Sequence, residues 1–304
     1  MVQDRPILGI VLMLGFCILA PLGDGMAKLL GETTALGLMV LVRFGMQAMI
    51  LIPLIAVTGK PWRMTPKILR LTMIRTLLHI TGLAAMFTAL QYLPLADTVA
   101  IAFVMPFIML LLGKYVLNEQ VGARRLIACI VGFAGTLLVI QPSFAQVGAP
   151  ALLPLIVAVV FSLFMLVTRQ IAKEIDPVSL QAVSGAMATA ILLPLILLGA
   201  WFGLPGMSLR TPTGDALWLL LGIGVLGTVA HLLMTWSLRY APSATLAPMQ
   251  YLEIPMATLF GWLIFHDLPN GLAALGIGIT IAAGLYVILH ERANARSGPS
   301  ETPA

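Results

Sequence analysis

The sequence predicts an all-α integral membrane protein with ten transmembrane helices, arranged as two inverted five-helix repeats. Of its 304 residues, 60% are hydrophobic and 10% are charged, and the mean hydropathy is +1.03. In a soluble domain roughly a quarter of the residues are charged, so an ordinary globular fold is excluded. Apolar runs long enough to cross a bilayer recur along the chain, and in lipid they must be helical to satisfy their own backbone.

The ten spans are separated by charged residues or by proline and glycine. They are predicted at residues 7–30, 35–58, 69–92, 95–117, 124–140, 152–172, 178–201, 215–239, 243–265 and 271–289. Arg5 followed by an apolar run resembles a signal peptide. A counterpart of this segment later in the chain argues that it is retained as the first span.

Lysine and arginine residues in the loops predict the orientation in the membrane. Those expected on one side are Arg5, Lys60, Arg63, Lys67, Arg70, Lys114, Arg124, Arg125, Arg169, Lys173, Arg239, Arg292 and Arg296. The other side keeps Lys28 and Arg210. Both termini are therefore expected in the cytoplasm. The net charge of +5 follows from these basic loops, and no nucleic-acid partner is expected.

The two halves of the chain repeat each other. ALQYLPLAD at 89–97 returns as SLRYAPSAT at 237–245, and MAK at 26–28 is echoed by IAK at 171–173. Each half holds an odd number of predicted spans, so the second half must be inverted, a construction that recurs in alternating-access transporters. The expected divisions are a cytoplasmic N-terminus (1–6), a first repeat (7–140), a periplasmic linker (141–151), a second repeat (152–289) and a disordered cytoplasmic tail (290–304).

The segment ALQYLPLADTVAIAFVMPFIMLLLGKYVLNEQ at 89–120 resembles the EamA family of the drug/metabolite transporter superfamily. The ordered set that carries the resemblance occurs twice, as Pro106, Glu119, Gly122 and Gly135 and again as Pro255, Asp267, Gly271 and Gly284. The resemblance covers nearly all of residues 7–289 and implies a ten-helix bundle that moves small metabolites across the bacterial inner membrane. APMQYLEIPMATLFGWLIFHDLPN is similar to the S-adenosylmethionine uptake branch, and GDGMAK is similar to riboflavin transporters.

Glu253 lies in the middle of the apolar stretch 246–265. An ionised carboxylate near the bilayer centre costs at least about 2.5 kcal/mol, so this group should face the bundle interior and be paired or protonated. Gln250 is expected on the same helical face, Tyr251 is adjacent, and Pro255 should free the carbonyl of Tyr251 by removing a backbone N–H. Together these residues would form a polar notch in an apolar helix, which we interpret as a site for a transported proton or a polar substrate group. The alternative is that the carboxylate of Glu253 is fixed to one histidine or arginine for packing.

His79 and His231 are expected near the centres of spans three and eight, which are equivalent under the repeat. His79 aligns with Gly227, so His231 is displaced by one helical turn. Both side chains could therefore reach one central cavity from opposite halves. Their expected role is proton relay or substrate hydrogen bonding, and the alternative is that each is a hydrogen-bonded core residue.

Arg43 and Arg75 are expected as buried cations in spans two and three. Arg43 matches an arginine common in the resembled family, and either residue could bind a substrate anion bidentately or neutralise a carboxylate such as Asp24 or Glu253. Arg75 is interpreted as structural, with a side chain that snorkels to the membrane surface. Asp24, between two glycines, is expected either to face a cavity or to pair with Lys28 four residues later.

Two further sets of residues complete the expectations for the site. Four aromatic residues could form a stacking platform for a flat ring, unless they pack in the core or face lipid: Phe103, Trp236, Tyr251 and Trp262. Cys17 and Cys129 match no metal-binding spacing and are interpreted as packing residues.

These features predict a secondary transporter, with uptake of riboflavin or a similar ring-containing vitamin or nucleoside-like compound favoured. Uptake of S-adenosylmethionine and export of amino acids or toxic metabolites are the alternatives. An integral membrane enzyme is disfavoured because the HExxH, GxSxG and nucleotide-binding motifs are absent from the sequence. The expected partners are a small-molecule substrate, the lipid bilayer and, as an open option, a co-transported proton. No cofactor or metal is expected, and no oligomer is indicated.

Overall fold

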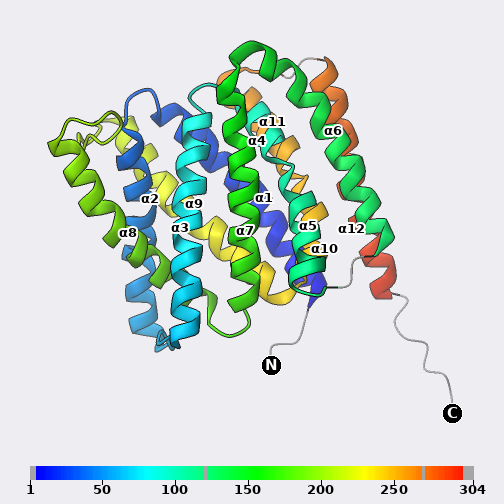
Figure 1. Cartoon of the computed structure of the whole chain (residues 1–304), viewed down its shortest axis with the longest axis horizontal. Coiled ribbons are helices and arrows are strands. Elements are labelled where there is room, and N and C mark those ends of the chain that lie inside the picture. Colours follow the sequence, from blue (N-terminus) through cyan, green and yellow to red (C-terminus); the bar gives the residue numbers. More distant parts are fainter. Residues whose placement is uncertain (1–4, 120–121, 269–270, 297–304) are drawn as a thin grey trace.

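A computed structural model describes residues 5–119, 122–268 and 271–296 and places them in a bundle of helices (Figure 1). In chain order the elements are α1 (Pro6–Leu30), α2 (Leu36–Thr58), α3 (Pro66–Ala89), α4 (Leu95–Ala102), α5 (Met105–Val116), α6 (Ala123–Val147), the 3₁₀ helix η1 (Ala149–Leu152), α7 (Leu153–Ile171), α8 (Pro177–Trp201), α9 (Asp215–Tyr240), α10 (Ser243–Gln250), α11 (Glu253–Phe265) and α12 (Gly271–Arg296). Within the described residues, seven helical segments are long and apolar enough to cross a membrane, and shorter apolar helices lie in α6, α11 and α12.

Most helix ends lie close to the predicted ends of the spans, and two helices are longer than expected. Residues 141–147, predicted as part of a linker, continue α6, which is followed by Gly148 with a φ of 66°. Glycine adopts a positive φ without strain, so residue 148 can turn the chain from α6 into η1. The predicted tail from residue 290 begins as helix, because α12 continues through HERANAR to Arg296. Residues 1–4 and 297–304, also predicted as terminal segments, lie outside the described residues.

Two predicted spans are interrupted rather than continuous. Helix α4 ends before Phe103 and α5 begins at Met105, while α10 ends before Tyr251 and α11 begins at Glu253. Pro106 and Pro255 lie in the first turns of α5 and α11. A proline is tolerated there because the first N–H groups of a helix have no partner inside the helix. The expectation that Pro255 frees the carbonyl of Tyr251 is wrong, since that oxygen accepts from the N–H of Ile254 at 3.3 Å.

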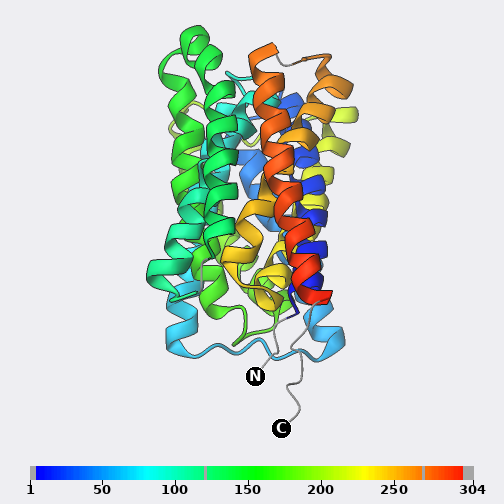
Figure 2. The same ribbon diagram turned by 90° about the vertical axis from the view of Figure 1, so that its right-hand side faces the viewer.

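The packing of the helices is reciprocal between the two halves. Helix α1 packs on α9 and α3 on α7; α4 packs on α11 and α5 on α10; α2 packs on α8 and α6 on α12. Each helix of the first half has a counterpart six numbers later, so that α1 corresponds to α7 and α6 to α12. When every helix is replaced by its counterpart, the same six pairs are obtained. Figure 2 shows α6 and α12 side by side at one edge of the bundle. Their backbones approach closely at Gly135, where an added Cβ would lie 2.7 Å from the carbonyl oxygen of Gly276.

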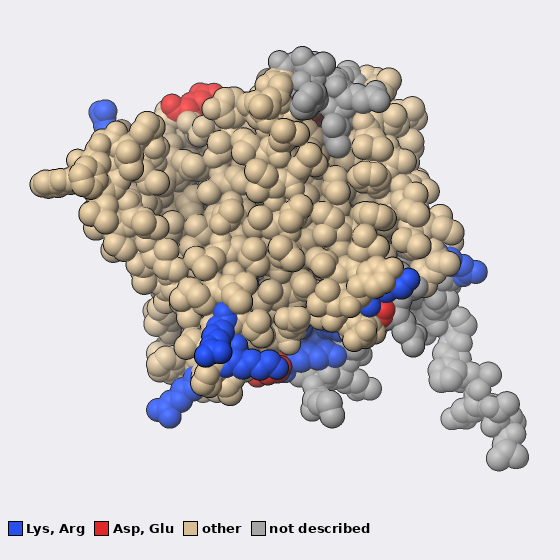
Figure 3. All heavy atoms as spheres, in the orientation of Figure 1, with Lys and Arg blue, Asp and Glu red and all other residues tan. Residues whose placement is uncertain are grey.

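The two ends of the bundle differ in charge. Helix α1 begins and α12 ends at the same end, which we call the terminal end; the opposite one is the far end (Figure 1). Lysine and arginine side chains gather along the terminal end, and a broad band without charged side chains lies above them (Figure 3). Exposed tryptophans are found toward both ends, with Trp62 after α2 at the terminal end and Trp201 and Trp218 at the far end.

Each end is held together by a cation from the first helix of one repeat. At the far end, Lys28 of α1 donates to the carbonyl of Leu93, just past α3, at 2.7 Å. At the terminal end, Arg169 of α7 donates to the carbonyl of Leu238 in α9 at 2.6 Å and forms an ion pair with Glu119 at 3.2 Å. The carboxylate of Glu119 also accepts from the backbone N–H of Ser243, the first residue of α10.

Candidate functional site

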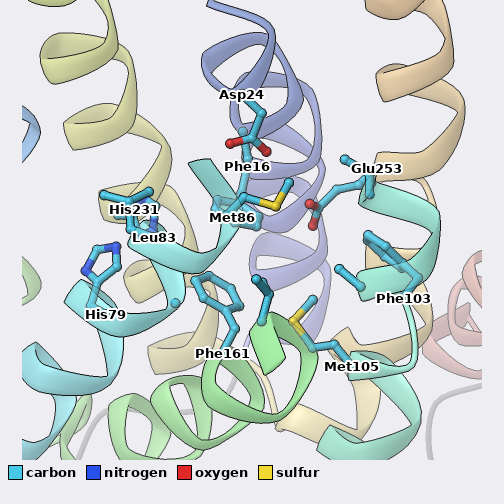
Figure 4. Close-up of a pocket in the computed structure, with 15 residues that line it drawn as sticks. Phe16, Asp24, His79, Leu83, Met86, Phe103, Met105, Phe161, His231 and Glu253 are labelled. Carbon is cyan, nitrogen blue, oxygen red and sulfur yellow. The ribbon is translucent and has the colours of Figure 1, made fainter. Parts of the chain in front are cut away.

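A cavity of about 90 Å³ lies between helices of both repeats. Helices α1, α3, α4 and α7 contribute most of its wall, and α5, α9 and α11 contribute one residue each. Its lining residues are Phe16, Ala20, Asp24, His79, Gly82, Leu83, Met86, Val99, Ala102, Phe103, Met105, Val157, Phe161, His231 and Glu253. The wall is therefore mainly apolar and aromatic, with four ionisable side chains (Figure 4).

Two of these side chains are carboxylic acids on neighbouring walls. Asp24 points into the cavity from α1, and Glu253 points into it from the first turn of α11 (Figure 4). Because the break in the span makes Glu253 the first residue of α11, its carboxylate lies where a helix favours negative charge. The two groups interact electrostatically with each other. Within the described part of the chain, Glu253 accepts a hydrogen bond from the thiol of Cys17 at 3.9 Å and is not fixed to one histidine or arginine.

The two histidines meet on the other side of the cavity. Their rings are stacked, with centroids 4.3 Å apart and an angle of 27° between the planes. His79 comes from α3 and is 1% exposed, and His231 comes from α9 and is 8% exposed. The rings are enclosed by four phenylalanines, Phe16, Phe44, Phe161 and Phe164. The structure thus brings the displaced pair of histidines together across the boundary between the repeats.

Arg43 of α2 holds His231 from behind the cavity. Its Nη2 lies 2.9 Å from Nδ1 of His231, and its Nη1 donates to the side-chain oxygen of Gln47 at 3.0 Å. The guanidinium group fits because residue 227 is glycine: a Cβ there would lie 1.9 Å from Nε of Arg43. Arg43 does not line the cavity, although it interacts electrostatically with Asp24.

Hydrogen bonds extend from Arg43 to α8 and back to α9. Gln47 donates to both the backbone and the side-chain oxygen of Gln181, at 2.6 and 3.0 Å. Gln181 in turn donates to the carbonyl of His231 and to the hydroxyl of Thr235, each at 2.8 Å. All five side chains are buried, so a network with many partners offsets the cost of placing them in an apolar bundle.

Arg75 is buried at the interface of α3, α7 and α8. Its Nε donates to Thr168 and its Nη1 to Ser184, both at 2.8 Å, and its guanidinium lies over the ring of Phe164 at 4.5 Å. The expected snorkelling to the membrane surface is wrong, because this side chain is 0% exposed. Of the two alternatives for Asp24, the structure shows the one that faces a cavity, while Lys28 donates to the carbonyl of Leu93 instead of pairing with it.

Other predicted site residues lie away from the cavity. The break before α11 separates Gln250 from the face of Glu253, and the amide of Gln250 contacts the sulfur of Met165 at 3.0 Å. Tyr251 points toward α6, where its hydroxyl donates to the carbonyl of Cys129 at 3.1 Å. Trp236 packs on a separate apolar cluster that includes Leu51, and Trp262 is 46% exposed. Of the expected four-ring platform, Phe103 lines the cavity, and the ring of Tyr251 packs against the ring of Phe103 from outside the cavity.

Several residues of the site were not predicted from the sequence. Gln47 and Gln181 could have been found by the argument used for Glu253, because each is a polar side chain inside an apolar span. Cys17 was interpreted as a packing residue, and it is buried as expected, yet its sulfur lies beside Glu253. Phe16 and Phe161 carry no signal that separates them from other aromatic residues in the spans. Among the described residues, no cluster of three or more histidine, cysteine or acidic side chains could hold a metal.

A bundle of membrane-spanning helices whose interior encloses ionisable and aromatic side chains defines a polytopic membrane protein with a functional site inside the bundle, as transporters have. The chain belongs to the EamA-like transporter family, which it matches over residues 7–141 and 149–289. It has two copies of the family pattern, one in each half.

Relatives from bacteria agree with this class. The riboflavin transporter of Rhizobium johnstonii is 29% identical over 79% of this chain and 74% of its own length. The S-adenosylmethionine uptake transporter of Rickettsia prowazekii is 22% identical over 95% of each chain. A solved crystal structure of a protein has a TM-score of 0.71 and 18% identity and covers 94% of this chain and 98% of its own, which shows a shared fold.

Proposed function

We propose that this protein takes up a small ring-containing metabolite across the bacterial inner membrane by alternating access, with riboflavin as the leading substrate. The observation that carries the proposal is the cavity between the repeats, in which Asp24, His79, His231 and Glu253 meet aromatic walls. Apolar pockets with a few convergent polar groups are the usual form of small-molecule sites. The chain acts by transport rather than by catalysis, as the names of its relatives indicate.

The proposed architecture has ten spans in two inverted repeats of five. The broken pairs α4–α5 and α10–α11 each count as one span, and α6 and α12 complete the set. Helices α1 and α7, the first of each repeat, run in opposite directions in Figure 1, which supports the inversion. The repeats are proposed to divide at residues 141–151, near the turn between α6 and α7. Interrupted helices at equivalent places of two repeats are a feature of secondary transporters, where they lie beside the substrate.

The terminal end is proposed to face the cytoplasm. Lysine and arginine residues of bacterial membrane proteins are retained on the cytoplasmic side, and Figure 3 shows them along this end. Both termini then lie in the cytoplasm, and the turn between α6 and α7 lies in the periplasm.

Riboflavin is favoured as substrate because relatives carry that name and because the cavity wall suits a flat ring. S-adenosylmethionine is the second candidate, and a separate observation favours it: two carboxylic acids face the cavity, where they would attract a sulfonium cation. At about 90 Å³ the cavity is smaller than the roughly 300 Å³ or more of a typical ligand pocket, so binding requires the helices to separate.

A proton is proposed as the coupling ion, carried by Glu253. An ionised carboxylate at this depth costs at least about 2.5 kcal/mol unless it is paired. Glu253 accepts from Cys17 and interacts electrostatically with a second acid, Asp24, and neither neutralises its charge. Glu253 is therefore expected to hold a proton in this conformation and to exchange it when the cavity opens.

The test is uptake of radiolabelled riboflavin into proteoliposomes with and without an inward proton gradient. Wild-type protein should accumulate riboflavin above equilibrium only with the gradient. Glu253→Gln keeps the shape of the side chain but cannot release a proton, so its uptake should not respond to the gradient. Glu174→Gln, an exposed acid between α7 and α8, is the matched control and should behave as wild type.

Each part of the proposal has its own contrary result. Equal gradient dependence in Glu253→Gln and wild type would remove Glu253 as the proton carrier. Uptake of S-adenosylmethionine without uptake of riboflavin would favour the second candidate. Export of a preloaded substrate as the faster direction would reverse the proposed direction of transport.

A further inference from the structure

The cavity has two chemically different poles: the histidines lie on one side and Glu253 on the opposite side, with Asp24 above and between them (Figure 4). The histidine pole consists of His79 and His231, from α3 and α9, and the acid pole consists of Asp24 and Glu253, from α1 and α11. Apolar and aromatic side chains, among them Phe161, line the wall between them. Because imidazole groups lie at one pole and carboxyl groups at the other, a ligand that contacts both poles needs a different kind of polar group at each of its ends.

At the histidine pole, the contact with Arg43 determines which nitrogen of His231 carries the proton. A guanidinium group has donors and no acceptor, so its 2.9 Å contact requires Nδ1 of His231 to accept. Nδ1 also lies 3.0 Å from the carbonyl of Gly227, but the hydrogen bond from a charged donor is the stronger of the two. The proton of neutral His231 is therefore on Nε2, which becomes a donor.

The histidine pole is left with unused hydrogen-bonding groups. Nε2 of His231 and both ring nitrogens of His79 are buried without a hydrogen-bond partner among the described residues. A buried polar group without a partner costs about 1–3 kcal/mol, so structures rarely retain one unless it serves a ligand or water. Both rings line the cavity, and a ligand atom that accepts a hydrogen bond would satisfy Nε2 of His231.

The acid pole offers the opposite chemistry. The carboxyl groups of Asp24 and Glu253 present mainly acceptor atoms, and two such groups lining one cavity repel each other if both are ionised. Hydroxyl or ammonium hydrogens from a ligand would fill these acceptors. The thiol of Cys17, 3.9 Å from Glu253, is too weak a donor to do so.

We propose that the cavity binds a planar heteroaromatic ring by its acceptor edge at the histidine pole, while a donor-rich substituent of the same molecule lies at the acid pole. This inference rests on the proposed uptake of a ring-containing metabolite and specifies which end of the molecule each pole binds. The isoalloxazine ring of riboflavin has carbonyl oxygens along one edge, and its ribityl chain carries hydroxyl groups, so riboflavin has both features.

The test compares the binding of two flavins by quenching of their fluorescence on the purified protein. Riboflavin carries the ribityl chain, and lumiflavin has the same ring with a methyl group in its place. His79→Phe keeps an aromatic ring at the histidine pole and removes both nitrogens. Glu253→Met keeps the length of the side chain at the acid pole and removes its acceptors. Thr258→Val, farther along α11 and outside the cavity lining, is the matched control.

Wild-type protein should bind riboflavin at least about tenfold more tightly than lumiflavin, since one or two net hydrogen bonds are worth this much. His79→Phe should weaken the binding of both flavins by a similar factor. Glu253→Met should weaken riboflavin toward the level of lumiflavin, with Asp24 keeping its own acceptors, and should leave lumiflavin unchanged; Thr258→Val should change neither. His231→Phe tests the same pole if His79→Phe does not fold.

Two outcomes would overturn the two-pole inference alone, and a third would overturn both the proposed substrate and the inference. Equal loss of both flavins in Glu253→Met, or unchanged lumiflavin binding in His79→Phe, shows that the poles do not divide the ligand in this way, although a flavin transporter would stand. Wild-type protein that binds neither flavin removes the proposed substrate, and the two-pole inference with it.

Discussion

At the scale of single residues, one glycine decides how the two repeats share the cavity. The first repeat places His79 at a position where the second has Gly227, and the missing side chain leaves room for Arg43. The imidazole of the second repeat comes instead from His231, one turn later, where Arg43 reaches its Nδ1. An exact copy of the first repeat would have filled the space that the guanidinium occupies.

Replacing Gly227 should therefore displace Arg43, which contacts His231 on the side away from the cavity. In Gly227→Ala the new Cβ would lie 1.9 Å from Nε of Arg43, so the guanidinium must move and release His231. We expect a loss of about 1–3 kcal/mol in stability, as for other overpacked interiors. Flavin binding should fall with it. Thermal unfolding in detergent and fluorescence titration measure the two effects.

Gly45→Ala is the control for this change. Gly45 also lies inside an apolar helix, α2, and a Cβ there would meet no atom within 4 Å. This variant should bind flavin as wild type does. If Gly227→Ala melts and binds like Gly45→Ala, the position of Arg43 does not matter to the site.

The sequence predicts the ionisable groups of the cavity better than its other residues. Asp24, His79, His231 and Glu253 were found because a polar side chain in lipid is costly and so needs a reason. The same argument places Arg43 in the interior, but it gives no direction for the side chain. Helical spacing assigned Gln250 to the site and fails there because the helix breaks before Glu253. The aromatic ring alone assigned Trp236, and it gives no direction for the side chain, which packs on another cluster.

At the scale of elements, the interrupted helices position the acid pole. Because the span breaks at Tyr251, Glu253 becomes the first residue of α11 instead of a side chain in mid-helix. The ring of Tyr251 packs where Gly132 of α6 leaves space, with a Cβ at residue 132 only 2.6 Å from the ring. Sequence reasoning placed the spans well, because apolar length is a strong signal. The breaks were missed, because Pro106 and Pro255 are compatible with both a kink and a new helix start.

The contact between α6 and α12 gives a prediction at this scale. An added Cβ in Gly135→Ala would lie 2.7 Å from the backbone oxygen of Gly276, and a backbone atom cannot rotate away as a side chain can. The two helices must separate, which should lower the melting temperature and cost about 1–3 kcal/mol. Gly278→Ala, on α12 with no atom within 4 Å of the new Cβ, should leave the melting temperature unchanged. Equal melting of the two variants would show that the close approach is not needed.

At the scale of the whole molecule, the two ends are built alike with different residues. Lys28 and Arg169 each tie the first helix of a repeat to the end of the third, through the carbonyls of Leu93 and Leu238. An acid from the fourth span of the other repeat lies near each cation: Glu119 pairs with Arg169, and Asp267 interacts electrostatically with Lys28. If the repeats rock about the cavity, these are the contacts that must open in turn.

Because the two ends are built alike, their contacts do not tell which end faces the cytoplasm. Accessibility labelling tests the proposed orientation in the membrane. Lys67→Cys and Arg210→Cys place thiols at exposed positions of the terminal and far ends, whereas Cys17 and Cys129 are buried. In intact cells a membrane-impermeant maleimide should label Arg210→Cys and leave Lys67→Cys unmodified. Permeabilised cells are the control, in which both should react. Labelling of Lys67→Cys in intact cells would place the terminal end in the periplasm.

The exposed tryptophans toward the two ends have a consequence for the surrounding lipid. Indole rings prefer the depth of the headgroups, so Trp62 on one side and Trp201 and Trp218 on the other hold the molecule at a set height. Helix α8 has 25 residues and is about 37 Å long, which exceeds a hydrocarbon layer of about 30 Å. If these helices tilt during transport, the nearby acyl chains must adjust to them, so the thickness of the membrane should affect the cost of the conformational change.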